Sequence, residues 1–161
     1  MSADTGDYVG RVWSSSIGGE IGSDLDAPTP AQSFDELAIV MKRAAGLRFD
    51  ERLPNFHLYG TDIVQAALSA GHGAYVATLP LVHNDTYKDQ LREDFMSAYR
   101  WMQRKWRDRL PLSTTVGSIT WHGLNMRVER LRWSRSVAKR LRVALPTEVD
   151  PRSYSARCGW E

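Results

Sequence analysis

The stretch from Tyr87 to Leu110 has the most regular pattern in this 161-residue chain. Its apolar residues recur at steps of three and four positions: Leu91, Phe95, Met96, Tyr99, Met102, Trp106 and Leu110. Basic residues fill many of the positions between them: Arg92, Arg100, Arg104, Lys105, Arg107 and Arg109. This spacing predicts a long amphipathic helix that Pro111 ends. The rest of the chain must then supply a surface that covers the apolar stripe.

Two shorter helices are predicted before this stretch. Ser33 and Glu36 have the spacing of a capping box, which predicts a helix over residues 34–45 that ends at Gly46. Thr61 and Asp62 are expected to cap a second helix, which ends at Gly71.

Two segments have the composition of strands. Residues 8–13 are rich in β-branched and aromatic side chains and lead into a Ser/Gly cluster, and residues 74–79 form a buried-strand pattern. Helices that alternate with strands indicate an α/β fold.

The composition excludes several classes of protein. Apolar residues make up 42% of the chain and charged residues 25%, which suffices for a core and excludes collagen-like and wholly disordered chains. No apolar run approaches the roughly 18 residues of a membrane span, and the first residues lack the features of a signal peptide. The single cysteine, Cys158, excludes an internal disulfide framework. We therefore expect a cytoplasmic protein.

Charge is distributed unevenly. Residues 1–90 carry 6 Lys/Arg against 12 Asp/Glu, whereas residues 91–161 carry 15 against 7. Much of the basic excess lies in residues 124–145, where leucine and valine could form an apolar stripe and arginines occupy the other faces. We expect this basic helix to form a tail extension over residues 115–161.

Four short segments carry a resemblance to a known family: Phe49-Asp50, residues 56–63 (FHLYGTDI), Val82-His83-Asn84 and Arg104-Lys105-Trp106. They resemble the C-terminal half of family-two-like glycosyltransferases, which have the nucleotide-diphospho-sugar transferase fold called GT-A. The resemblance covers roughly residues 8–112. It implies a partial GT-A half-domain over residues 1–114, with a mixed sheet, flanking helices and the basic tail beyond it.

The resemblance also implies a reaction. The family transfers a sugar from a nucleotide-diphospho-sugar to a hydroxyl acceptor on a sugar, lipid or protein. Asp62 corresponds to the general base that takes the proton of the acceptor hydroxyl, so a single displacement would invert the anomeric centre. The alternative is that Asp62 only caps its helix.

Further positions acquire roles from the same resemblance. His83 is a candidate ligand of a divalent metal, Mn²⁺ or Mg²⁺, the alternative being a strand-end histidine bonded to backbone. Tyr59, His57 and Trp13 are candidate acceptor contacts, because aromatic faces stack on sugars, and are equally plausible as core. Lys105 and Arg104 are candidate ligands of the leaving diphosphate; the alternative is a solvated helix face.

The chain departs from the family at its beginning. A donor-binding half with an Asp-x-Asp motif should precede residue 8, and Asp24-Leu25-Asp26 has these letters only in a polar loop. We therefore expect the donor-binding half to be missing, which leaves open whether this chain is active alone.

A non-enzymatic function is the alternative. The basic helix at 124–145 would then bind nucleic acid or an anionic membrane surface, although no motif for specific nucleic-acid recognition is present. A third interpretation is that the tail packs its apolar stripe on the domain and leaves its arginines in solvent.

Overall fold

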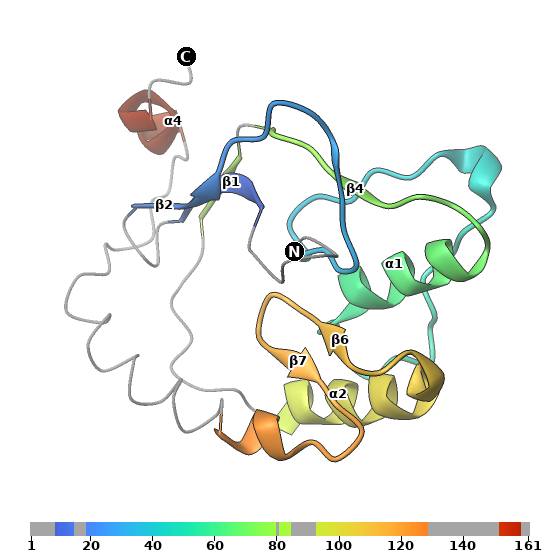
Figure 1. Cartoon of the computed structure of the whole chain (residues 1–161). Helices are drawn as coiled ribbons and strands as arrows, with labels where there is room; N and C mark the ends of the chain where they lie inside the picture. The colour runs from blue at the N-terminus through green and yellow to red at the C-terminus, as the bar shows by residue number, and fades with distance from the viewer. Residues whose placement is uncertain (1–8, 15–18, 80, 85–92, 129–151, 159–161) are drawn as a thin grey trace.

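The computed structural model describes residues 9–14, 19–79, 81–84, 93–128 and 152–158 (Figure 1). The strands are β1 (Gly10–Ser14), β2 (Gly19–Ser23), β3 (Thr29–Pro30), β4 (Tyr75–Val76), β5 (Val82–His83), β6 (Leu112–Ser113) and β7 (Ser118–Ile119). The α-helices are α1 (Tyr59–Ser69), α2 (Glu93–Lys105) and α4 (Arg152–Cys158), and the 3₁₀ turns are η1 (Arg43–Ala45) and η2 (Arg107–Arg109). Residues 124–128 are also helical.

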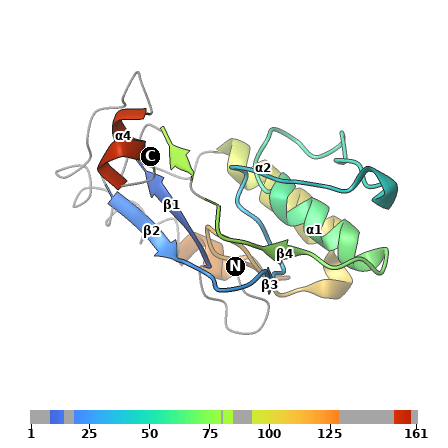
Figure 2. The same ribbon diagram turned by 90° about the horizontal axis from the view of Figure 1, so that it is seen from above.

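The strands form three small sheets. The largest has the order β2-β1-β5, in which β1 is antiparallel to β2 and parallel to β5 (Figure 2). Strands β3 and β4 form a second sheet, and β6 and β7 form a hairpin. The expected mixed α/β class is confirmed, and β1 lies where the sequence predicts a strand. The predicted strand at 74–79 is much shorter, because only Tyr75–Val76 pair with a neighbour.

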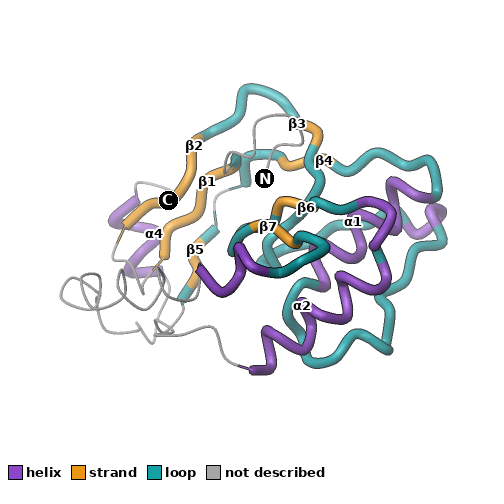
Figure 3. The backbone as a smooth tube through the Cα atoms, turned by 60° about the horizontal axis from the view of Figure 1, so that its bottom comes forward, coloured by secondary structure: helices purple, strands orange, loops and turns teal. Residues whose placement is uncertain are grey.

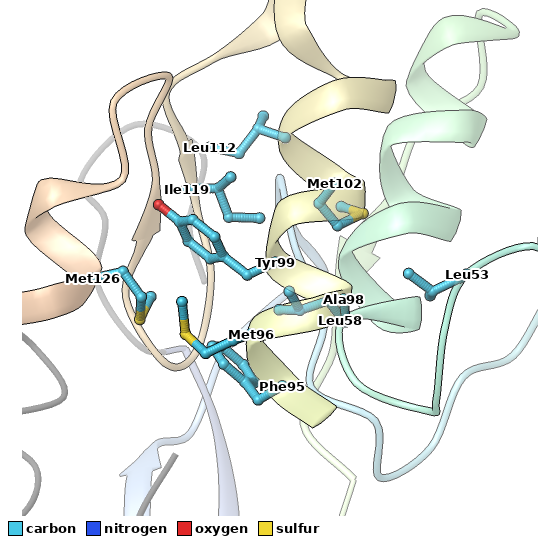
Figure 4. Close-up of a cluster of buried hydrophobic side chains, with 10 residues drawn as sticks. All are labelled: Leu53, Leu58, Phe95, Met96, Ala98, Tyr99, Met102, Leu112, Ile119 and Met126. Carbon is cyan, nitrogen blue, oxygen red and sulfur yellow. The ribbon is translucent and has the colours of Figure 1, made fainter. Parts of the chain in front are cut away.

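The core forms on the apolar face of α2. Ten buried residues make up this cluster (Figure 4): Leu53, Leu58, Phe95, Met96, Ala98, Tyr99, Met102, Leu112, Ile119 and Met126. Five of them lie on α2 at steps of three and four positions, so the predicted amphipathic helix is confirmed over Glu93–Lys105. The α-helix ends before the predicted Leu110, because Arg107–Arg109 form a 3₁₀ turn instead. Residues 87–92 of the predicted helix lie outside the described residues.

The core also crosses the expected boundary at residue 114. Strand β6 pairs with β7 across that position, and Ile119 and Met126 are fully buried in the α2 cluster. Residues 115–128 therefore belong to the same core as α2, because their apolar side chains cover it. Helical structure is present at 124–128, and the rest of the predicted 124–145 helix lies outside the described residues.

The predicted helix at 34–45 is wrong. Only Arg43–Ala45 form a single 3₁₀ turn in this region. The carboxylate of Glu36 was expected to cap a local helix, but it accepts the N–H of Gly60 at the start of α1, at 3.4 Å. The backbone oxygen of Glu36 accepts the hydroxyl of Tyr59 at 3.0 Å. The capping residue therefore serves a helix that is distant in sequence.

Gly60 makes this contact possible. A Cβ atom at position 60 would lie 2.5 Å from the backbone oxygen of Phe34, closer than any real contact of this kind. The absence of a side chain lets residues 34–36 lie directly against the first turn of α1.

Helix α1 is present where a helix is predicted, but the predicted cap is wrong. The helix begins at Tyr59, and the N-cap residue is Leu58, whose φ of 66° is left-handed. Asp62 lies inside the first turn, and its backbone N–H donates to the oxygen of Leu58. Its side chain makes no capping hydrogen bond and is directed at α2 instead.

None of the described helices is long and apolar enough to cross a membrane.

Burial raises the pKa of Glu36 from its ordinary 4.5 to about 7, with a further contribution from the charge of Asp35. Hydrogen bonds from the backbone of Gly60 and Leu58 oppose this shift without cancelling it. The folded state therefore binds a proton at Glu36 at pH values where the unfolded state has lost it. This contribution to stability is complete below pH 4.5 and declines as the pH rises to about 7.

We expect Glu36→Gln to remove this decline. Glutamine mimics the protonated acid and still offers an oxygen to Gly60, so the variant should be more stable than the wild type at pH 8, by about 1–3 kcal/mol. Urea unfolding at pH 5, 6, 7 and 8 measures the effect. If the free energy of unfolding changed with pH in the same way for both proteins, Glu36 would not titrate in this range.

Candidate functional site

Residues from three separate segments meet at the ammonium group of Lys105. Its Nζ atom lies 2.8 Å from Oδ2 of Asp50 and 2.8 Å from Oδ1 of Asp62. The indole Nε1 of Trp106 donates to Oδ1 of Asp62 at 2.7 Å. Arg52 completes the group by a contact of 2.8 Å with Oδ2 of Asp50. We call Asp50, Arg52, Asp62, Lys105 and Trp106 the Lys105 cluster.

The side chains of the cluster range from exposed to buried. Arg52 is 82% exposed, Lys105 24%, Asp50 14% and Asp62 only 4%. The rings of Trp101 and Trp106 lie 4.6 and 5.2 Å from the Lys105 ammonium group and cover it with aromatic faces. The most buried charge, that of Asp62, thus has Lys105 and Trp106 as donors, whereas the more exposed Asp50 accepts from Arg52 and Lys105.

Local structure positions each member of the cluster. Asp50 begins a tight turn in which Leu53 donates to its backbone oxygen and Arg52 to its side chain. Asp62 projects from the first turn of α1 toward α2. Lys105 and Trp106 lie at the C-terminal end of α2, where a cation is also favoured by the helix dipole. A second link, from Arg109 to Gln65 at 3.5 Å, lies one turn further along both elements.

The guanidinium of Arg52 and then the ammonium of Lys105 hold the pKa of Asp50 well below its usual range. Hydrogen bonds from cations favour the charged form of a carboxylate. Asp50 therefore stays ionised through the whole physiological range.

Asp62 has one position left for a further donor. Its Oδ1 accepts a hydrogen bond from Trp106 and also lies 2.8 Å from the ammonium group of Lys105, whereas Oδ2 accepts only from Lys105, at 2.9 Å. A carboxylate oxygen has two lone pairs, so Oδ2 retains one that no described residue uses. The carboxylate is held in one orientation by two side chains of α2.

The ammonium group of Lys105 bridges two carboxylates, and its predicted role as a ligand of the leaving diphosphate stays a prediction. Arg104, its neighbour, is exposed and has no carboxylate partner among the described residues. It lines a shallow hollow with Arg100, Gln103, Arg107, Leu110 and Trp121. The side chain of Trp121 is 79% exposed there.

The candidate acceptor contacts do not all come together. Tyr59 and His57 both lie at the start of α1: Tyr59 packs edge-on against Phe49, with ring centroids 5.4 Å apart. His57 stacks on Phe56 and lies 3.5 Å from a carboxylate oxygen of Asp94. Trp13 is buried on β1, in the other part of the molecule. Its role as an acceptor contact stays a prediction.

His83 is also distant from Asp62. It lies on β5, opposite Ser14 of β1, whereas α1 lies on the other side of the molecule (Figure 3). Within the described ranges, no three His, Cys, Asp or Glu side chains gather in a way that could hold a metal ion. The role of His83 as a metal ligand stays a prediction. Asp24 of the Asp-x-Asp letters forms an ion pair with Arg11 at 3.2 Å.

The sequence suggested no role for three members of the cluster: Asp50 and Trp106, which lie in the segments that carry the resemblance, and Arg52, which lies outside them. A signal was present in the spacing of two pairs. Asp62 and Gln65 are one turn apart, as are Lys105 and Arg109, and the two pairs are complementary.

Comparisons of the chain with family models, with curated proteins and with solved structures found no match.

We expect Lys105→Met to lower the free energy of unfolding by about 3 kcal/mol, because Asp62 would remain buried without its charged partner. Arg104→Met is the matched control: it removes the adjacent cation, which is exposed, and should change stability by no more than about 0.5 kcal/mol. Urea unfolding followed by circular dichroism compares the two. Equal losses would show that the Lys105 cluster adds nothing to stability.

Proposed function

We propose that this chain carries the acceptor-side part of a glycosyltransferase, which moves a sugar from a nucleotide-diphospho-sugar to a hydroxyl group. One observation carries the proposal: segments that define the resemblance meet in space. Asp50, Asp62 and the pair Lys105-Trp106 come from three of these segments, and hydrogen bonds of 2.7–2.9 Å join both carboxylates to Lys105 and Asp62 to Trp106. A chance similarity in sequence does not require the matched segments to converge.

Asp62 has the chemistry for the proposed base. The acceptor hydroxyl would donate its proton to the open lone pair of Oδ2 while its oxygen attacks the anomeric carbon. The bond from that carbon to the diphosphate oxygen breaks as the new bond forms, so the configuration inverts. General-base assistance of this kind contributes roughly 10²–10⁴-fold to the rate.

Asp50 explains how Asp62 accepts a proton beside a cation. Protonation neutralises Asp62 and would leave Lys105 without its buried partner. Oδ2 of Asp50 already accepts from the same ammonium group at 2.8 Å, so Lys105 retains a counter-charge throughout the transfer. The charge of Asp50 persists because Arg52 and Lys105 hold its pKa low.

In the native protein we expect Asp62→Asn to lower turnover by about 10²–10⁴-fold and to leave the KM for the donor nearly unchanged. Asparagine keeps an oxygen for Trp106, and Lys105 keeps Asp50, so the fold should survive. The measurement is transfer of sugar from nucleotide-diphospho-sugars with Mn²⁺ present, followed by mass spectrometry.

Glu51→Gln is the matched control, because it removes an exposed carboxylate beside Asp50. His83→Ala should instead raise the KM for the donor if that histidine binds metal. In a protein that joins this chain to a donor-binding half, unchanged turnover in Asp62→Asn would reject the base, and no transfer from any nucleotide sugar would reject the function.

A second candidate function, binding of a polyanion, is favoured by the hollow beside α2. Three arginines, Arg100, Arg104 and Arg107, surround it, and the exposed ring of Trp121 forms part of its lining. Cations that contact phosphates and a ring on which a base stacks are the elements of single-strand nucleic-acid binding. One of these cations is already engaged, because Arg100 forms a 2.7 Å ion pair with Glu93.

We expect the chain to bind single-stranded DNA weakly and without sequence preference, and to release it near physiological salt. Replacing both Arg104 and Arg107 by Gln should reduce the slope of log K against log salt by about 1.4, since each phosphate contact contributes about 0.7. Fluorescence titration at several salt concentrations provides the slope. Sequence-selective binding that persists at high salt would favour this function over sugar transfer.

A further inference from the structure

Residues 37–41 form a run of five apolar residues, Leu-Ala-Ile-Val-Met, that the fold covers only in part. The side chain of Val40 is 93% exposed, and those of Leu37 and Met41 are 36% and 37% exposed. The run is followed by the turn η1 (Figure 2). We call residues 37–41 the open segment.

The backbone of the open segment is also unpaired. None of its five residues forms a hydrogen bond with another described residue, whereas the residues at its two ends do. The oxygen of Glu36 accepts from Tyr59, and the oxygen of Lys42 accepts from Ala45. Lys42 has the extended angles φ −69° and ψ 126°. Backbone donors and acceptors in such a run are available to another chain.

The sequence pattern favours burial as a strand. A continuous apolar run of this length, with β-branched Ile39 and Val40 at its centre, is typical of a strand that is covered on both faces. The structure provides no cover for Val40 and only partial cover for Leu37, Ile39 and Met41. The apolar pattern predicts burial, whereas the structure leaves part of the segment exposed. The two agree only if a partner adds the missing contacts.

Charge identifies the chemistry of that partner. From residue 37 to residue 49 the chain carries Lys42, Arg43 and Arg48 and no acidic residue. These three cations line a hollow at the end of the open segment together with Met41, Gly46 and Leu47. A cationic hollow beside an apolar run is complementary to a segment that combines apolar and acidic residues.

We propose that the open segment is a docking site for an extended, acidic segment of a second polypeptide, which pairs with it as a β-strand. Hydrogen bonds between the two backbones supply binding energy, and an acidic side chain that enters the hollow at Lys42, Arg43 and Arg48 supplies specificity. A lipid surface fits less well, because a membrane core leaves the unpaired backbone groups of an extended run without partners. The site shares no residue with the proposed catalytic centre and does not depend on it.

The experiment uses the full chain and three blocked peptides. The first is the acidic strand-former EVTVTVE, the second replaces both glutamates by lysine, and the third is the acidic peptide with N-methylated backbone on alternate residues. Titrations are followed by ¹H–¹⁵N spectra and by amide hydrogen exchange. We expect only the acidic peptide to shift the amides of residues 37–41 and to slow their exchange.

Variants at two positions separate backbone pairing from charge. Val40→Pro removes one backbone donor that has no partner among the described residues, and it should abolish binding, whereas Val40→Thr keeps the donor and should retain most of it. Arg43→Glu should weaken binding of the acidic peptide about two- to fivefold and strengthen that of the lysine peptide. If Val40→Pro does not fold, the N-methylated peptide tests the same point.

Three results would overturn the proposal. Equal binding of the N-methylated peptide would exclude strand pairing, and equal binding of the lysine peptide would exclude the acidic partner. Binding to anionic vesicles with a gain of helix at residues 37–45, and without protection by any peptide, would identify a membrane surface as the ligand instead.

Discussion

The structure depends on one ammonium group that two carboxylates share. Lys105 joins the turn that begins at Asp50, the first turn of α1 and the end of α2 by contacts of 2.8 to 2.9 Å. Apolar packing alone tolerates rotation and sliding of one helix against another, because it is not directional. A buried carboxylate with three donor contacts allows one arrangement. The Lys105 cluster therefore fixes how α1 lies against α2, and every group attached to α1 takes its position from it.

The same cluster determines what happens to the charge of Lys105 when Asp62 accepts a proton, as proposed for the base. When Asp62 takes a proton as proposed, it loses the charge that pairs with Lys105, and this loss costs free energy. The second carboxylate reduces this cost, because the cation does not lose its partner when Asp62 is neutralised. An arrangement that served stability alone would need only one carboxylate. The second carboxylate, that of Asp50, is therefore the feature of the cluster that supports the proposed role of Asp62 as a base.

Much of the helical structure was predictable from the sequence, because periodicity is a local property. The pattern around Phe95, Tyr99 and Met102 identified α2, and the apolar residues after Asp62 identified α1. The helix predicted at 34–45 failed because Glu36, which has the right spacing to cap it, bonds instead to Gly60, 24 positions away. A local motif cannot show which of two helices its side chain will serve.

The candidate site was predictable in its residues but not in its contacts. The sequence singled out Asp62 and Lys105 for separate roles, and the structure pairs them across 43 positions. Such a pairing depends on how two helices pack, which no single segment determines. By contrast, His83 and Trp13 were expected near the acceptor and metal, and the β2-β1-β5 sheet carries them away from α1.

Three of the ten core residues are methionines: Met96, Met102 and Met126. Their unbranched thioethers adapt to irregular spaces, so the helical residues 124–128 can shift against α2 at little cost in packing energy. Oxidation would reverse this advantage, because a sulfoxide places a polar oxygen where the neighbours are apolar. Met102 and Met126 are fully buried, so an oxidant reaches them only when the core opens. The rate at which these two sulfurs react with peroxide therefore reports how often α2 and the segment after β7 separate.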